Sequence, residues 1–121
     1  PIAQDANLSP DDYKILEKIQ NLIDREKIYQ DPTFGRAELA RELGTGEANL
    51  SRIINQCYGK TIPQFLNEWR VKDAQKLLTD TDVPIQNVFE ESGFNSVTTF
   101  NRVFKEISGD TPKEYRAKFR H

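Results

Sequence analysis

The sequence predicts an all-α fold of about seven helices, arranged as two helix-turn-helix subdomains joined by a long connecting helix. Three observations support this prediction: apolar residues recur at helical spacing, strand-like alternation is absent, and one segment is repeated. The repeat relates LSRIINQCYGKTIPQF at 50–65 to FNRVFKEISGDTPKEY at 100–115. We therefore expect two similar helical units within the 121 residues.

The composition indicates a globular domain that needs no metal, cofactor or disulfide. Hydrophobic residues make up 36% of the chain, and no apolar run is long enough to span a membrane. Cys57 is the only cysteine and His121 the only histidine, which argues against an internal disulfide and the common zinc clusters. We expect Cys57 to be a buried apolar residue, and we expect no enzyme activity, no membrane contact and a cytoplasmic, nucleoid-associated location.

Charge is unevenly distributed along the chain. The net charge of −2 and the pI of 5.5 weigh against a nucleic-acid partner. Residues 1–31, however, hold seven acidic and four basic side chains, whereas residues 102–121 hold three acidic and six basic ones. The composition therefore allows a basic surface near the end of the chain.

We divide the chain into four segments. They are a linker remnant at 1–8, a first helix-turn-helix subdomain at 9–60, the connecting helix at 61–80 and a second subdomain at 81–121. Because the sequence does not begin with methionine, we expect it to come from a longer protein that also holds a sensor or dimerisation domain.

The first half predicts three helices before the connecting helix. One is expected at about 10–28, capped by Ser9, and a second at 35–43. A turn at 44–46 leads into a third at 47–58, which Gly59 can end in a left-handed conformation. The residues expected to point inward from the first two are Tyr13, Leu16, Ile19, Leu22, Ile23, Ala37, Leu39, Ala40 and Leu43.

The second half repeats this plan after a connecting helix at about 62–78. A short helix at 84–92 is followed by a turn at 93–95, a helix at 96–107 and a last helix that opens near Pro112. The positions matched at an offset of 50 pack a helix, end it at glycine, or cap the next one with threonine. Most of the repeat is therefore expected to be structural.

The outward faces of the two equivalent helices share a composition that suits a DNA major groove. Arginine can bond guanine, asparagine and glutamine suit adenine, and small or methyl-bearing residues can meet thymine. An ordinary solvated helix face is the alternative for either helix alone, and the presence of two such faces favours DNA. In the second helix the inward arc is expected to hold Val97, Phe100, Val103, Phe104 and Ile107.

Three stretches carry a family resemblance that extends over about residues 8–119. GFNSVTTFNRVFKEISGDTPKEYR resembles the signature at the end of the DNA-binding domain of AraC/XylS-type transcription regulators. ELARELGTGEANLSRIIN and YGKTIPQFLNEWRVKDAQKLL resemble the first helix-turn-helix and the connecting helix of the same domain. One departure is Phe89, which stands where that family usually has alanine.

The resemblance implies sequence-specific binding of double-stranded DNA by the output module of a larger regulator, with two recognition helices in successive major grooves. It implies no cofactor, and it makes RNA polymerase a second candidate partner. Arg52 and Arg102 are the foremost base-contacting candidates. The full set implied to contact bases is Ala48, Asn49, Ser51, Arg52, Val97, Thr98, Asn101 and Arg102. The set implied to contact phosphates is Lys60, Asn95, Ser96, Lys105 and Thr111.

Three alternatives remain open at the level of sequence. The chain could be a helical protein-interaction module that docks to a polymerase or partner subunit without contacting bases. Trp69 is a core residue or a stacking platform for bases, and its helical stripe favours the core. Arg70 forms a structural ion pair or contacts DNA, and its place in the connecting helix favours the structural role.

Overall fold

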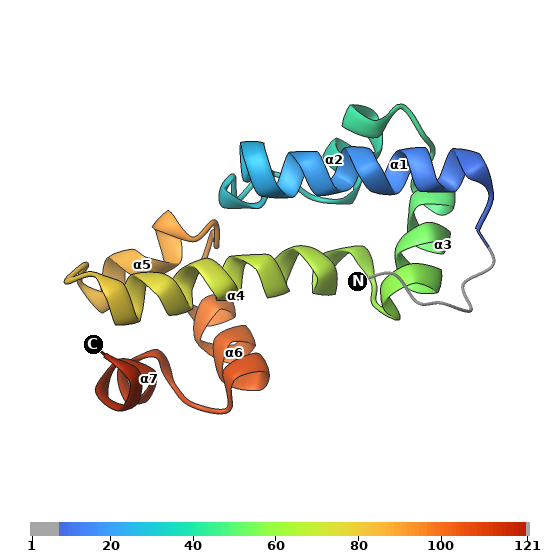
Figure 1. Cartoon of the computed structure of the whole chain (residues 1–121). Coiled ribbons are helices and arrows are strands. Elements are labelled where there is room, and N and C mark those ends of the chain that lie inside the picture. The colour runs from blue at the N-terminus through green and yellow to red at the C-terminus, as the bar shows by residue number, and fades with distance from the viewer. Residues whose placement is uncertain (1–7, 121) are drawn as a thin grey trace. The chain divides into compact units, whose positions relative to one another are not determined.

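The computed structural model describes residues 8–120 and contains seven α-helices in that range (Figure 1). They are α1 (Pro10–Asn21), α2 (Arg36–Leu43), α3 (Glu47–Tyr58), α4 (Ile62–Asp80), α5 (Ile85–Glu91), α6 (Val97–Ser108) and α7 (Pro112–Phe119). The described residues include no strand, so the all-α prediction is confirmed. Apart from Leu8, the linker remnant predicted at 1–8 lies outside the described residues.

The helices divide into two compact units. The first consists of residues 8–28 and Phe34–Leu66, and the second of Tyr29–Thr33 and residues 67–120. The first turn of α4 therefore belongs to the first unit and the rest of α4 to the second. The segment between α1 and α2 also contributes to the second unit, although both helices belong to the first.

A capping box starts α1. Ser9 Oγ accepts a hydrogen bond from the Asp12 amide at 3.1 Å, and Asp12 Oδ2 accepts one from the Ser9 amide at 3.0 Å. The regular α-helix ends at Asn21, earlier than the predicted boundary at 28, because a π-helix over Leu22–Glu26 follows it. Lys27 then ends the helix in the left-handed conformation, with φ of 47°.

Two residues predicted to point inward in the first unit are instead exposed. Tyr13 is 48% exposed, and Ala37 also faces solvent. The buried side of α1 begins with Asp12, which takes the place expected for Tyr13 and continues the helical spacing of the apolar residues. The buried hydrophobic residues of α1, α2 and α3 are Leu16, Ile19, Leu39, Ala40, Leu43, Leu50, Ile53, Ile54 and Cys57.

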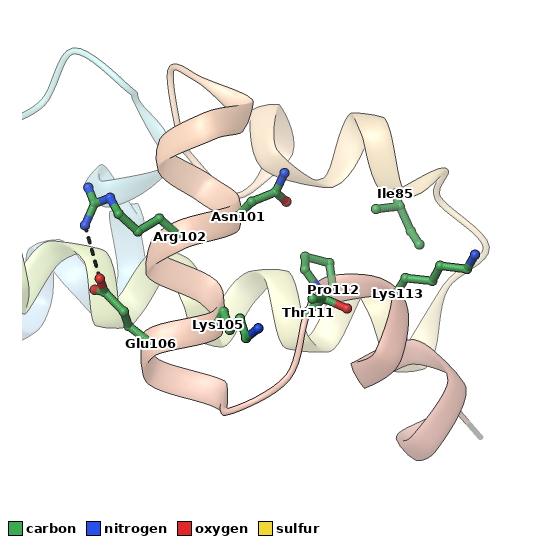
Figure 2. Close-up of a pocket in the computed structure, with 8 residues that line it drawn as sticks. All are labelled: Ile85, Asn101, Arg102, Lys105, Glu106, Thr111, Pro112 and Lys113. Carbon is green, nitrogen blue, oxygen red and sulfur yellow. Dashed lines mark hydrogen bonds and ion pairs between the residues drawn. The ribbon is translucent and has the colours of Figure 1, made fainter.

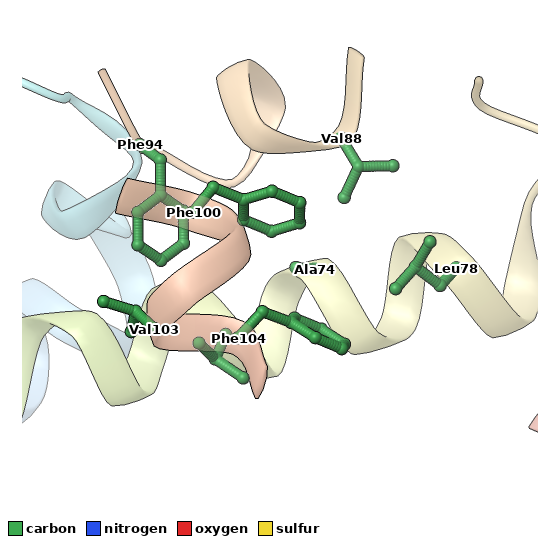
Figure 3. Packing of buried hydrophobic residues seen from close by; sticks show 8 residues of the cluster. Ala74, Leu78, Val88, Phe94, Phe100, Val103 and Phe104 are labelled. Atoms are coloured by element: carbon green, nitrogen blue, oxygen red, sulfur yellow. The ribbon is translucent and has the colours of Figure 1, made fainter. Parts of the chain in front are cut away.

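The core of the second unit is built around Phe100 (Figure 3). Its ring centroid lies 5.2 Å from that of Phe94 and 5.6 Å from that of Phe104. Phe89 is half-buried at 6.4 Å from Phe100, so this ring forms part of the packing. The other fully buried members are Val71, Ala74, Leu78, Val88 and Val103.

The inward arc predicted for α6 was wrong at both of its ends. Val97 is 48% exposed and Ile107 is 43% exposed. Val97 is the first residue of α6 and Ile107 the last but one, and only the middle of the helix is buried. A periodic stripe gives the direction of a side chain but not whether a neighbouring element covers it there.

The matched positions of the repeat have the predicted structural roles. Gly59 and Gly109 end α3 and α6 in left-handed conformations, with φ of 68° and 82°. Thr111 caps α7 through a box with Glu114. Thr61 makes the equivalent pair of bonds with Gln64 at the start of α4, at 2.9 and 3.2 Å. Both copies therefore end one helix and begin the next by the same chemistry.

Segment 29–33 is held in the second unit by α4 and by the turn after α5. Arg70 is buried and donates to the carbonyl oxygens of Tyr29 and Asp31, which confirms its structural role. Trp69 is half-buried, with its ring centroid 6.2 Å from that of Tyr29 and Lys72 Nζ 4.2 Å above it. Trp69 therefore packs within the unit, though less deeply than a core residue.

Candidate nucleic-acid interface

In the first unit, α2 and α3 are joined by a tight turn. Gly44 ends α2 in a left-handed conformation with φ of 68°, a geometry that glycine adopts without strain. Gly46 is the N-cap of α3 and supplies no side-chain cap. Thr45, between them, accepts a hydrogen bond from Asn49 Nδ2 at 3.0 Å. The turn is thus tied to the first turn of α3 through the threonine side chain.

The predicted base-contacting residues of α3 all lie outside its buried face. Ala48 and Arg52 are exposed, and Asn49 and Ser51 are half-buried. The Arg52 guanidinium forms a bidentate ion pair with Asp12, at 2.8 and 3.1 Å. Arg52 also donates to Asn49 Oδ1 at 2.7 Å and to Gln56 Oε1 at 3.1 Å. This arginine is therefore firmly held by its own unit.

The ion pair between Asp12 and Arg52 changes the protonation behaviour of both groups. The pKa of Asp12 is lowered from 3.8 to about 2. The hydrogen bond from the Arg52 guanidinium is the largest cause, and the hydrogen bond from the Ser9 amide is the next. The bond with Asp12 also raises the pKa of Arg52. Both effects favour the charged forms, so the pair remains ionised at neutral pH.

In the second unit, α5 and α6 form the equivalent arrangement with a different cap. Ser96 Oγ accepts from the Thr99 amide at 3.0 Å and so caps α6. The four residues predicted to contact bases from this helix are all exposed, namely Val97, Thr98, Asn101 and Arg102. Among the described residues, Arg102 bonds only Glu106, at 3.4 Å, and both side chains are 62% exposed.

A pocket of about 730 Å³ lies along the outer side of α6 (Figure 2). The α6 side chains Asn101, Arg102, Lys105 and Glu106 line it together with Thr111, Pro112, Lys113 and Ile85. The structure thereby brings together four of the predicted site residues. Three positive charges and one negative charge stand around the pocket, which gives this side of the unit a basic character.

Lys113 and Ile85 are pocket residues that the sequence did not single out. Lys113 is an exposed cation in the first turn of α7. Ile85 is the first residue of α5, and only the fold places it beside α6 and α7. Basic side chains near a helix start are a signal that could have identified Lys113, whereas the position of Ile85 required the tertiary structure.

The predicted phosphate-contacting residues occupy different environments. Lys105 and Thr111 line the pocket, and Asn95 is exposed in the turn before α6. Ser96 and Lys60 are half-buried, at the start of α6 and after the end of α3. The Thr111 amide donates to the Glu114 carboxylate at 2.9 Å, which lowers the pKa of Glu114, so a negative charge already occupies the start of α7.

Two features of other protein classes are absent from the described residues. Within 8–120, no three histidine, cysteine or acidic side chains are grouped closely enough to hold a metal ion. In the same range, no helix combines the length and the apolar character that a membrane crossing requires. Cys57 is buried as predicted, and burial raises the pKa of its thiol.

Each unit thus contains two helices around a tight turn, the second presenting an uncovered polar face, which defines a protein with two helix-turn-helix units. A family model described as a helix-turn-helix domain matches residues 39–118. An uncharacterized HTH-type transcriptional regulator of Staphylococcus aureus is 32% identical over 100 residues, 83% of this chain and 13% of that protein. The Arabinose operon regulatory protein of Escherichia coli is 31% identical over 108 residues, 89% of this chain and 36% of that protein.

The same likeness holds among solved structures. The C-terminal domain of the two-component response regulator yesN from Fusobacterium nucleatum superposes with a TM-score of 0.77 at 31% identity. The match covers 85% of this chain and 98% of that one. The chain belongs to the AraC-type helix-turn-helix family and is a DNA-binding domain of the kind found in transcription regulators. It spans about a third or less of the length of these two curated relatives.

Proposed function

We propose that this chain binds double-stranded DNA sequence-specifically, with α3 and α6 in successive major grooves, as the output module of a larger regulator. The observation that supports this most directly is the pair of uncovered helix faces, each at the same place in a helix-turn-helix unit. A recognition helix of this motif contacts base edges from such a face, and successive grooves are about 34 Å apart.

The proposed base-contacting surfaces are those expected from the sequence. The first consists of Ala48, Asn49, Ser51 and Arg52, and the second of Val97, Thr98, Asn101 and Arg102. We propose that phosphates are bound beside them by Lys105, Lys113, Asn95, Ser96, Thr111 and Lys60. The basic rim of the α6 pocket supports the phosphate contacts near the second surface.

Membership of this family supports a proposal about where the protein acts and with which partners. We propose that the protein acts in the cytoplasm on the nucleoid, by binding and not by catalysis. A sensor or dimerisation domain of the same protein would supply the regulatory signal, and RNA polymerase is a further partner for a regulator bound beside a promoter.

Selection from random duplex DNA tests the proposal. Two enriched blocks about one helical turn apart are expected, because each surface would select its own block. Titration of the enriched duplex at several salt concentrations should give a steep, linear loss of log affinity, since bound phosphates release counterions. A protein that enriches no duplex and binds without salt dependence would instead be a protein-docking module.

Two variants of α6 then separate a base contact from a phosphate contact. We expect Arg102→Ala to relax the preference for one base pair in one block only, at a cost of about 1–3 kcal/mol. Lys105→Ala should weaken binding to all duplexes by a similar factor. Equal loss at both blocks for Arg102→Ala would contradict the assignment of α6 to one groove.

A further inference from the structure

The two repeated arginines, Arg52 and Arg102, lie in different environments although the sequence aligns them. A hydrogen-bonded network runs from Thr45 through Asn49 and Arg52 to Asp12, the residue that starts α1. In the second unit, the guanidinium of Arg102 has a single long bond to an exposed carboxylate. Of the two matched arginines, Arg52 therefore has a partner distant in sequence, Asp12, whereas Arg102 faces outward.

The terminal N–H donors of Arg52 are already used within the first unit. Nη1 donates to Asp12 Oδ2 and Gln56 Oε1, and Nη2 donates to Asp12 Oδ1 and Asn49 Oδ1. Each terminal nitrogen of a guanidinium carries two N–H groups, so these four bonds account for all four. A bidentate contact with guanine needs two N–H groups, and the Nε N–H can supply only one of them, so Arg52 could make the contact only by breaking at least one existing bond.

Breaking the ion pair between Asp12 and Arg52 is costly, because Asp12 is buried. Its side chain is 6% exposed, whereas that of Arg52 is 41% exposed, so the carboxylate is the buried partner of the pair. Removing the arginine from it would leave a buried carboxylate that accepts only the hydrogen bond from the Ser9 amide. The guanidinium is therefore held on the Asp12 side and presents its remaining bonds to Asn49 and Gln56.

Asn49 keeps the two hydrogen-bonding positions that adenine requires. Its Oδ1 accepts one bond, from Arg52, and an amide oxygen has a second lone pair. Its Nδ2 donates one bond, to Thr45, and has a second hydrogen. Both amide atoms are thus oriented by the protein and still able to pair with the N6 and N7 groups of adenine.

From this geometry we propose that Arg52 is a positioning residue that acts through Asn49. Arg52 thereby leaves the set of direct base contacts proposed above. Asn49 is the residue of α3 that hydrogen-bonds a base, with an A·T pair as its target, and Asp12 sets its orientation through Arg52. Arg102 contacts its base directly. This inference rests on the proposed function, because it assigns roles within the DNA surface proposed above.

The test compares base discrimination among four single variants and one double variant of the chain. Discrimination is the ratio of affinities for the selected duplex and for a duplex changed at one base pair. Partial unfolding lowers both affinities equally and leaves that ratio unchanged. Asn49→Ala, Arg52→Ala and Asp12→Asn each interrupt the network. Ser9→Ala is the matched control, because it removes the other half of the capping box and leaves the carboxylate on Arg52.

All three network variants should lose discrimination at the same A·T pair, by roughly tenfold, the value of one good bidentate contact. The Arg52→Ala/Asn49→Ala double variant should lose no more than Asn49→Ala alone. Ser9→Ala should retain the wild-type ratio at every position. These results together would establish that Arg52 acts through Asn49.

The proposal is overturned if Arg52→Ala abolishes discrimination at a base pair that Asn49→Ala still distinguishes, because Arg52 would then contact that base itself. Wild-type discrimination in Asp12→Asn would equally reject the role of Asp12. A wild-type protein that selects no duplex would instead reject the proposed function, so the two failures are distinguishable.

Discussion

The Nε of Arg70 donates to the main-chain carbonyl of Tyr29 at 2.7 Å, which joins α4 to a segment 41 residues earlier in the chain. Burial lowers the pKa of Arg70, because the charged guanidinium loses contact with water. The hydrogen bonds to the carbonyl oxygens of Tyr29 and Asp31 offset this desolvation. Arg70→Met keeps the apolar stem and leaves the buried carbonyl of Tyr29 without this donor. We expect a loss of about 1–3 kcal/mol in unfolding free energy, measured by urea denaturation.

Arg41→Met provides the control for Arg70→Met, because Arg41 is exposed on α2. It should change stability by no more than about 0.5 kcal/mol. Equal effects of the two substitutions would show that segment 29–33 gains nothing from Arg70.

Gly93 should tolerate no side chain. A Cβ there would lie 2.1 Å from the carbonyl oxygen of Tyr29, and the residue has φ of 101°. Gly93→Ala must therefore displace segment 29–30, and we expect a loss of more than about 4 kcal/mol in thermal unfolding followed by circular dichroism.

Gly109→Ala separates backbone strain from steric overlap. Gly109 also has a positive φ, of 82°, but a Cβ there meets open space. Only the conformational cost of about 1–2 kcal/mol should appear. If Gly93→Ala were no worse than Gly109→Ala, the close approach of Tyr29 would have no energetic consequence.

Substitutions of Phe100 and Val97, both on α6, should affect different properties: the first protein stability and the second DNA affinity. Phe100 is 1% exposed and packs against three other rings, so Phe100→Ala should cost about 3–5 kcal/mol. Val97 is 48% exposed, and Val97→Ala should leave stability within about 0.5 kcal/mol while altering DNA affinity. Calorimetry and duplex titration of both variants check this, and a large loss of stability in Val97→Ala would place that side chain in the core.

Asp12 should make the unfolding free energy depend on pH in the acidic range. Its pKa is lowered from 3.8 to about 2 in the folded chain, so unfolding takes up protons in this range. The stabilisation is present above pH 3.8 and is lost as the pH falls towards about 2. In urea denaturation, the stability difference between wild type and Asp12→Asn should therefore shrink over this window. A difference that stays constant would mean that the ion pair with Arg52 does not form.

Lys113 should contribute a phosphate contact without base preference. Its place on the rim of the α6 pocket predicts that Lys113→Ala reduces the slope of log affinity against log salt by about 1. The sequence preference found by selection should be unchanged. Lys76→Ala, an exposed lysine of α4 outside the pocket, is the control expected to leave the slope as it is. Equal slopes for wild type and Lys113→Ala would remove Lys113 from the interface.

Local signals in the sequence predicted the helices and their ends well. Gly59 and Gly109 end helices because a left-handed residue strongly favours glycine, and the threonine boxes at Thr61 and Thr111 follow from short-range bonding. The helix predicted at about 10–28 continues to Glu26, but its change to a π-helix at Leu22–Glu26 has no sequence signal of its own. The inward positions predicted for Tyr13, Ala37, Val97 and Ile107 were wrong, because periodicity does not say where a covering element stops.

The sequence by itself determined the helical fold, the repeat and the outward faces of α3 and α6, since spacing and capping act over a few residues. The tertiary structure decided which outward residues are held in place. Asp12 and Arg52 are 40 residues apart, and no periodic pattern relates them. Only packing of α1 beside α3 brings the buried carboxylate to the guanidinium, and this contact distinguishes Arg52 from Arg102.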